Sequence, residues 1–133
     1  MFNPPDIYNI TCPSIEETYT NIARALGRGK RPDKKDIICY LRGWKDLDTC
    51  SRHKSNYFYQ HFGHMECIGS GKAEKVLVVA IKGNPKNFGI HVLCDDCAER
   101  YIQSNEQKVK TISKYKKVTP RKEIYIYNVD ELV

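Results

Sequence analysis

The chain lacks the features that place a protein in a membrane or send it out of the cell. None of its stretches approaches the ~18 consecutive apolar residues that a membrane-spanning helix requires. Its first residues, MFNPPDIYNITCPS, contain no basic region followed by an apolar region, so no secretory signal is expected. The sequence therefore predicts a protein of the cytoplasm, or of the nucleus in a eukaryote, that is neither secreted nor membrane-bound.

Several enzyme signatures are also missing. The 133 residues contain no phosphate-binding Walker loop, no glycine-rich dinucleotide loop and no Ser-His-Asp order. They contain no internal repeat and no low-complexity tract. These absences argue against nucleotide-dependent enzymes, serine hydrolases and repeat proteins, and the length indicates one domain over residues 1–133.

The chain is rich in positive charge and in cysteine. Its net charge of +6 favours anionic partners, nucleic acid before others. Because no secretory signal is expected, its six cysteines are predicted to be thiols or metal ligands rather than disulfides. Cys12 and Cys39 stand alone in apolar stretches, so they are expected to be reduced thiols packed in the core.

The N-terminal part, residues 1–45, is predicted to be helical. Residues 14–26 form an amphipathic pattern that begins with a capping box of Ser14 and Glu17. The basic loop RGKRPDKK follows, and in it Asp33 can cap a second short helix. The sequence therefore predicts two helices ahead of the first strand.

The rest of the chain alternates between strand and helix patterns. KVLVVAIK, residues 75–82, is predicted to be a strand, and IHVL, residues 90–93, a returning strand, with GNPKNFG as the turn of the hairpin. After Cys94, apolar residues keep helical spacing beyond Glu106. EIYIYNV, residues 123–129, alternates as a strand does, so the predicted fold class is α+β.

Side chains that bind metal ions are concentrated between positions 50 and 97. A structural zinc site takes four nitrogen or sulfur ligands in a tetrahedron, commonly as two pairs with two intervening residues each. Cys94 and Cys97 form one such pair at the start of the predicted helix. The positive potential of a helix N-terminus stabilises thiolates, so this pair is well placed to bind Zn²⁺.

The other pair has two candidates in the sequence. HMECIGSG offers His64 with Cys67, and CSRH offers Cys50 with His53. We favour His64 and Cys67, because the glycines that follow suit a zinc knuckle, whose backbone amides turn toward the thiolate. Other arrangements remain open: the mixed set of Cys50, Cys67, Cys94 and Cys97, or a second metal ion held with His61 or His91.

The order of knuckle, hairpin, ligand pair and helix resembles the treble-clef zinc finger over residues 64–105. The resemblance implies a structural zinc ion within a module of residues 46–115, to which residues 116–133 add a C-terminal strand and tail. The ligands that it implies are His64, Cys67, Cys94 and Cys97.

The HNH nucleases are similar to this arrangement, so their catalytic residues were sought in the chain. The family needs a general-base histidine and an asparagine or histidine in the helix, whereas the helix AERYIQSN has no histidine. His91, Gln103 and Asn105 would be an unusual set. Asp95 and Asp96 more simply complement the helix N-terminus. The zinc is therefore predicted to be structural and the protein non-enzymatic.

Two basic runs flank the predicted zinc module. They are RGKRPDKK, residues 28–35, and KVKTISKYKKVTPRK, residues 108–122, and the second contains no acidic residue. Lysine and arginine neutralise phosphates, and Tyr115 could stack on a base; the alternative is a solvated face. The candidate nucleic-acid contacts are Arg28, Lys30, Arg31, Lys108, Lys110, Lys114, Lys116, Lys117 and Arg121.

These features together predict a small zinc-binding protein that binds nucleic acid or is associated with transcription. One alternative is a protein-interaction adaptor, such as a viral or phage factor that docks on a host complex. The other is an HNH-like nuclease. A salt series of binding to DNA and RNA separates these functions, because phosphate contacts leave a steep salt dependence.

Overall fold

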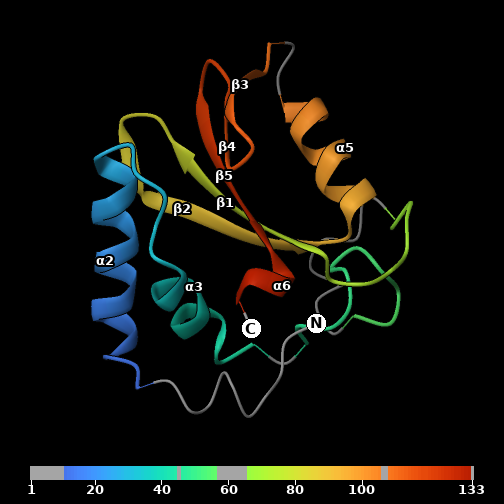
Figure 1. The fold of residues 1–133 in the computed structure, drawn as a ribbon, viewed down its shortest axis with the longest axis horizontal. Helices are drawn as coiled ribbons and strands as arrows, with labels where there is room; N and C mark the ends of the chain where they lie inside the picture. Colours follow the sequence, from blue (N-terminus) through green and yellow to red (C-terminus); the bar gives the residue numbers. More distant parts are fainter. Residues whose placement is uncertain (1–10, 45, 57–65, 106–107, 133) are drawn as a thin grey trace.

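The structure, a computed structural model, describes residues 11–44, 46–56, 66–105 and 108–132. A five-stranded antiparallel sheet in the order β2-β1-β5-β4-β3 lies between helices, with α2 and α3 on one side and α5 on the other (Figure 1). The helices are α2 (Ile15–Gly27), α3 (Lys34–Leu41), α5 (Asp95–Asn105) and α6 (Val129–Leu132), and the strands are β1 (Lys75–Ile81), β2 (Asn84–Leu93), β3 (Lys110–Ser113), β4 (Lys116–Val118) and β5 (Lys122–Asn128). The predicted α+β class is confirmed.

The two predicted N-terminal helices are present. The Ser14 side chain accepts a hydrogen bond of 3.1 Å from the backbone N–H of Glu17, which satisfies a donor that the first helical turn of α2 leaves free. Asp33 occupies the N-cap of α3, but its side chain makes no cap hydrogen bond. Within the part of the chain that the structure describes, no helix is long and apolar enough to cross a membrane.

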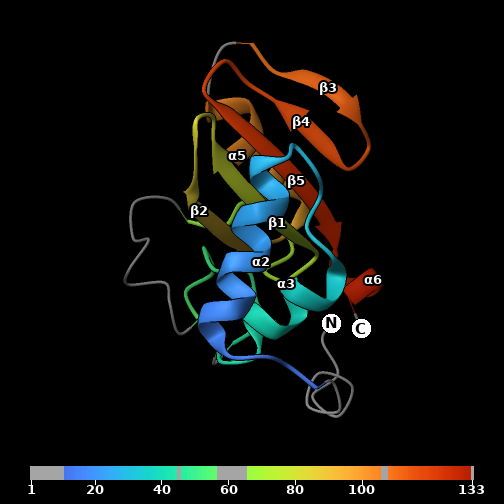
Figure 2. The same ribbon diagram turned by 90° about the vertical axis from the view of Figure 1, so that its left-hand side faces the viewer.

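Strand β1 is buried on both faces because helices cover both sides of the sheet (Figure 2). Val76 and Val78 belong to the apolar cluster beneath α2 and α3. Leu77 and Val79 belong to the cluster beneath α5. Successive side chains of a strand point to opposite faces, so a strand between two layers of helix must be apolar along its whole length.

The hairpin of β1 and β2 is longer than the sequence predicts. GNPKNFG was expected to be a turn, but β2 already begins at Asn84, which pairs with Ile81. The turn is only Lys82 and Gly83, and Gly83 has φ 78°, as tight two-residue turns require. Because β2 is an edge strand of the sheet, it can accommodate Pro85, which has no N–H to donate.

The helix expected to extend beyond Glu106 instead ends at Asn105. The next described residues form a hairpin of β3 and β4, and β4 pairs with β5. All four residues of β3 are exposed, and Ile112 retains 53% of its accessible surface. The apolar residues here therefore lie in two different environments: Val109 packs against the cluster beneath α5, whereas Ile112 lies on the exposed strand β3.

The prediction that Cys12 and Cys39 are separate reduced thiols is wrong. The structure joins them in a disulfide, with their Cα atoms 5.7 Å apart. Cys39 lies in α3, whereas Cys12 lies before α2, 27 positions earlier in the sequence than Cys39. Their pairing follows from the return of α3 alongside the segment that leads into α2, which no local pattern reveals.

Candidate metal centre

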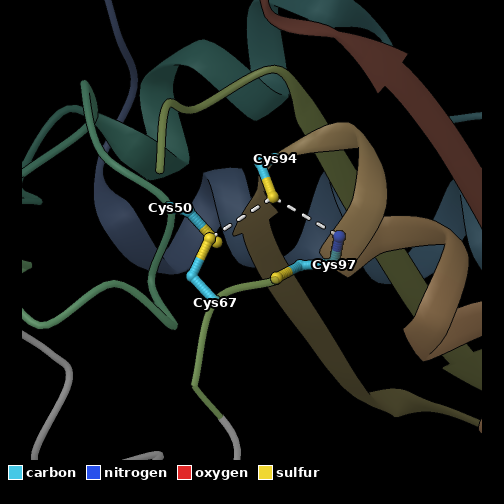
Figure 3. A group of neighbouring side chains, drawn as sticks. All are labelled: Cys50, Cys67, Cys94 and Cys97. Atoms are coloured by element: carbon cyan, nitrogen blue, oxygen red, sulfur yellow. Dashed lines mark hydrogen bonds between the residues drawn. The ribbon is translucent and has the colours of Figure 1, made fainter. Parts of the chain in front are cut away.

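Four cysteine side chains converge at one end of the sheet (Figure 3). Their Sγ atoms all lie within 4.8 Å of one another, and the sulfur atoms of Cys67 and Cys94 are 3.6 Å apart. Thiolates bound tetrahedrally at ~2.3 Å from zinc would be separated by about 3.8 Å. The group can therefore hold a metal ion, and its members are Cys50, Cys67, Cys94 and Cys97.

One pair of these cysteines is positioned by the junction of β2 and α5, as the sequence predicts. Cys94 directly follows the last residue of β2, and Cys97 lies in the first turn of α5. The backbone N–H of Cys97 donates to Cys94 Sγ over 3.4 Å. The free N–H groups and the dipole of a helix N-terminus both favour negative charge, so this position offsets part of the cost of burying a thiolate.

The other two cysteines come from loops that are paired with each other. The backbone N–H of Cys50 donates to the carbonyl of Gly71 over 2.9 Å. The N–H of Cys67 donates to the carbonyl of Arg52 over 3.1 Å. These backbone bonds hold two residues that are 17 positions apart in the sequence beside the Cys94–Cys97 turn.

The cysteine group corresponds to the mixed set that the sequence left open. Of the favoured ligands, Cys67 is present in it, and His64 lies outside the described residues. Of the alternative pair, Cys50 is present, whereas His53 does not belong to the group. The Nδ1 atom of His53 is instead 2.7 Å from the hydroxyl of Ser55.

Two glycines beside Cys67 let the chain pass close to the sulfur atoms. A Cβ at Gly69 would lie 2.9 Å from Cys94 Sγ and 2.6 Å from Asp96 Oδ2, so only glycine fits there without a shift. Gly71 has φ 75°, and a Cβ there would meet His53 at 2.7 Å. The predicted role of these glycines as a tight turn at the ligand is consistent with both contacts.

The environment favours protonated thiols at three positions and a thiolate at one. Burial raises the pKa values of Cys50 and Cys94 to about 11, and it also raises that of Cys97. Burial opposes ionisation of Cys67 too, but hydrogen bonds from the Gly69 backbone and from the Cys94 thiol outweigh it and lower the pKa. A divalent cation would supply the charge that four buried thiolates need.

Arg100 also contacts the site, although no local pattern in the sequence marks it. Its Nη2 atom donates to the carbonyl of Glu66 over 2.8 Å and lies 3.7 Å from Cys97 Sγ. Four thiolates around a divalent cation carry a net negative charge, and a guanidinium at this position offsets part of it.

The candidate residues for a nuclease do not form a second metal site. Among the described residues, the four cysteines are the only group of three or more His, Cys, Asp or Glu side chains close enough to share an ion. His91 packs against the Tyr101 ring at 4.7 Å, and burial lowers its pKa to about 4. Gln103 donates to Glu99 on the exposed side of α5.

The two basic runs, 80 positions apart in the sequence, meet on one side of the molecule. Lys116 Nζ in β4 donates to the carbonyl of Gly29 over 3.0 Å. The Arg31 guanidinium stacks over the ring of Tyr115 at 4.2 Å. The loop between α2 and α3 therefore lies against the β3–β4 hairpin, and their charges combine.

Two of the nine predicted contact residues have structural roles. Arg31 donates to the carbonyl of Ile126 over 2.7 Å and pairs with Glu131, and Lys116 lies 3.7 Å from a carboxylate oxygen of Glu123. Lys117 is half-buried and donates to Thr111 over 3.0 Å. The remaining six are exposed: Arg28, Lys30, Lys108, Lys110, Lys114 and Arg121.

No protein-family model, curated protein or solved structure matches the chain. The chemistry of the site is therefore argued from its residues alone.

Proposed function

We propose that the four cysteines hold one structural zinc ion in a treble-clef-like arrangement. Cys67 lies in the loop before the β1–β2 hairpin, and Cys94 with Cys97 starts the helix after it. Cys50 would complete the tetrahedron from an upstream loop. Four thiolates leave no open position for a substrate, which is typical of structural rather than catalytic zinc.

Elemental analysis of protein purified without added metal tests this assignment. We expect about one zinc per chain, lost when Cys94 and Cys97 are both replaced by serine. Iron at the same stoichiometry would contradict the choice of zinc, since a tetrahedral set of four sulfur atoms also suits iron. Metal-free protein that is fully folded would contradict the metal site itself.

We further propose that the basic side of the molecule binds nucleic acid and that the protein is not an enzyme. The observation that supports this most is the meeting of the two basic runs, joined by the contact of Lys116 with Gly29. Separate runs are commonly solvated faces, but cations gathered on one surface raise the local concentration of a polyanion. The exposed residues of the β3–β4 hairpin, Lys110 and Lys114, extend this surface.

A salt series of binding to single- and double-stranded DNA and RNA tests the function. We expect log affinity to fall linearly with log salt, and the slope to decrease by roughly 0.7 to 0.9 for each phosphate contact that is removed. The triple change Lys110→Gln, Lys114→Gln and Lys117→Gln should lower the slope without changing zinc content. The matched control replaces three exposed lysines elsewhere, Lys54, Lys72 and Lys86.

The same experiment distinguishes the alternatives. If no DNA or RNA binds at low salt, the proposal is wrong, and a protein-interaction adaptor takes its place. Cleavage that depends on added metal would indicate a nuclease instead. Equal losses in the two triple variants would show that net charge, rather than this surface, governs binding.

A further inference from the structure

A hollow of about 390 Å³ lies between the last turns of α2 and the first turn of α3. Its volume is within the range of small-ligand sites, ~300–1,000 Å³. The loop that joins the two helices runs beside β5 (Figure 2), and its residues Lys30 and Arg31 are part of the lining of the hollow. Its charged lining residues are Arg24, Arg28, Lys30, Arg31, Asp33 and Asp36.

The cations of this hollow are of two kinds. Arg31 is held in place by an ion pair with Glu131 and a hydrogen bond to the carbonyl of Ile126. Its guanidinium also stacks on the rings of Tyr115 and Tyr127, so its position is fixed. The other three, Arg24, Arg28 and Lys30, are exposed and form no ion pair within the described part of the chain. These three cations repel one another, and a bound anion would relieve the repulsion that the two carboxylates of the lining do not offset.

Two acidic residues also line the hollow and offset part of this positive charge. Asp36 accepts a hydrogen bond from the Asn21 side chain, and burial raises its pKa above the ordinary value. Asp33 is at the N-cap of α3 and forms no ion pair among the described residues. Because Arg24, Arg28 and Lys30 outnumber the two carboxylates by one, the hollow keeps a positive balance of charge.

We propose that the α2–α3 hollow binds a phosphate monoester. Arginine forms paired hydrogen bonds with phosphate oxygens, and a concave site can surround the three free oxygens of a terminal phosphate. A phosphodiester inside a strand has only two free oxygens and a chain on either side, so it fits an open surface better. The monoester has two possible sources: the terminal phosphate of a nucleic-acid strand, or a small phosphorylated molecule. For the first source, the inference rests on the proposed function.

The contact between Lys116 and Gly29 supports the strand-end source. It joins the loop that lines the hollow to the β3–β4 hairpin, so a strand whose terminal phosphate sits in the hollow has a basic path leading away from it. Arg24 and Arg28 also complement the C-terminal dipole of α2. If that is their sole role, the hollow will show no preference for phosphate monoesters.

Binding of four oligonucleotides tests the proposal. All four share one sequence. The first carries a 5′-phosphate, the second a 3′-phosphate, and the third a hydroxyl group at each end. The fourth also has a hydroxyl group at each end and is one nucleotide longer. The last adds a diester charge without a monoester. We expect one phosphorylated end to bind about tenfold more tightly than both hydroxyl forms, as one or two charge-assisted hydrogen bonds would give.

The variant Arg24→Gln with Arg28→Gln should abolish that preference. Because Arg28 also belongs to the basic surface, the variant should lower the affinity for hydroxyl-ended strands by a smaller factor than for the preferred phosphorylated strand. Lys72→Gln with Lys86→Gln removes the same charge elsewhere and should keep the preference. Inorganic phosphate alone, at constant ionic strength, should shift the backbone NMR signals of Arg28, Gly29 and Lys30. Such shifts without any preference among oligonucleotides would assign the hollow to a small phosphorylated molecule.

Absence of both the preference and the phosphate-dependent shifts would overturn the proposal. If hydroxyl-ended strands still bind with a steep salt dependence, the nucleic-acid function stands without the hollow. If no strand binds but phosphate shifts these signals, the hollow stands and the nucleic-acid function fails. An equal loss for all four strands in the double arginine variant would also overturn the monoester assignment.

Discussion

The two faces of the sheet are stabilised in different ways. Beneath α2 and α3, sixteen buried apolar residues of the described chain form one cluster, and none of them is a cysteine. Beneath α5 the cluster has ten, of which three are Cys50, Cys94 and Cys97. Hydrophobic stabilisation scales with buried apolar area, so the α5 face receives less of it and depends more on a cross-link.

Each face also has its own cross-link. The Cys12–Cys39 disulfide ties the segment before α2 to α3, and the proposed metal ties two loops to the start of α5. A disulfide responds to reductants and a zinc site to chelators. We therefore predict that the two sides can be destabilised separately, and four substitutions test this, in order of decreasing effect.

Replacing Cys97 by serine should have the largest effect. Loss of one ligand removes most of the metal affinity, and metal binding in such sites contributes on the order of several kcal/mol or more to folding. We expect loss of zinc and a large decrease in the melting temperature. Zinc analysis with calorimetry checks this, and a chelator added to the wild type should reproduce the result. An unchanged melting temperature in the zinc-free Cys97→Ser variant would show that the α5 face needs no metal.

Replacing Cys12 by serine should destabilise the α3 side by about 2–4 kcal/mol, because the disulfide restricts the unfolded chain. Zinc content should stay the same, which separates this cross-link from the metal site. Chemical denaturation measures the loss, and a reductant that does not bind zinc should give the same shift in the wild type. Release of zinc from the Cys12→Ser variant would contradict the independence of the two faces.

The α5 face should weaken at acid pH through His91. Burial, aided by the charges of Arg52 and Lys122, lowers the pKa of His91 from an ordinary 6.5 to about 4. The unfolded chain takes up a proton near pH 6.5 and the folded chain only near pH 4. The stabilisation is thus complete above pH 6.5 and is lost as the pH falls toward 4, up to ~3 kcal/mol in all.

Urea unfolding across this pH range measures the effect. The variant His91→Phe keeps a ring against Tyr101 but cannot titrate, so its stability should fall less steeply between pH 6.5 and 4. Protonation of the cysteines affects both proteins alike. Parallel curves for the variant and the wild type would refute the contribution of His91.

Replacing Gly69 by alanine should have the smallest effect of the four on stability. The new Cβ would lie 2.9 Å from Cys94 Sγ, so the loop must move, at a cost of about 1–3 kcal/mol. We expect weaker zinc binding in a competition assay with a chromogenic chelator. Gly43→Ala is the matched control, because a Cβ there meets no atom within 4 Å. Equal zinc affinity in both variants would mean that the loop adapts freely.

Local signals in the sequence were enough to predict several elements. The Ser14 cap and the apolar spacing after it identify α2, and the β-branched run identifies β1. The pair of Cys94 and Cys97 at a helix start was also evident, because strand, thiols and helix follow one another directly. In each case the residues that interact are near neighbours in the chain.

The features that local patterns did not identify depend on residues far apart in the sequence. Cys50 lies near Cys67 because backbone hydrogen bonds, accepted by the carbonyls of Gly71 and Arg52, hold the two loops together. The segment after α5 forms strands because β5 offers it a free edge to pair with, a partner that hydrophobic spacing alone does not reveal. The disulfide of Cys12 with Cys39 depends on the return of α3.

Local patterns in the sequence specify α2, α3, β1, β5 and the start of α5, together with the supply of cysteine ligands and the two basic runs. Only the tertiary structure decided which cysteines meet, which cations support the fold and which remain exposed. The physical reason is that short-range signals act through the geometry of a few adjacent residues. Sheet order and loop pairing, by contrast, set the distances between side chains such as Lys116 and Gly29, which lie 87 positions apart.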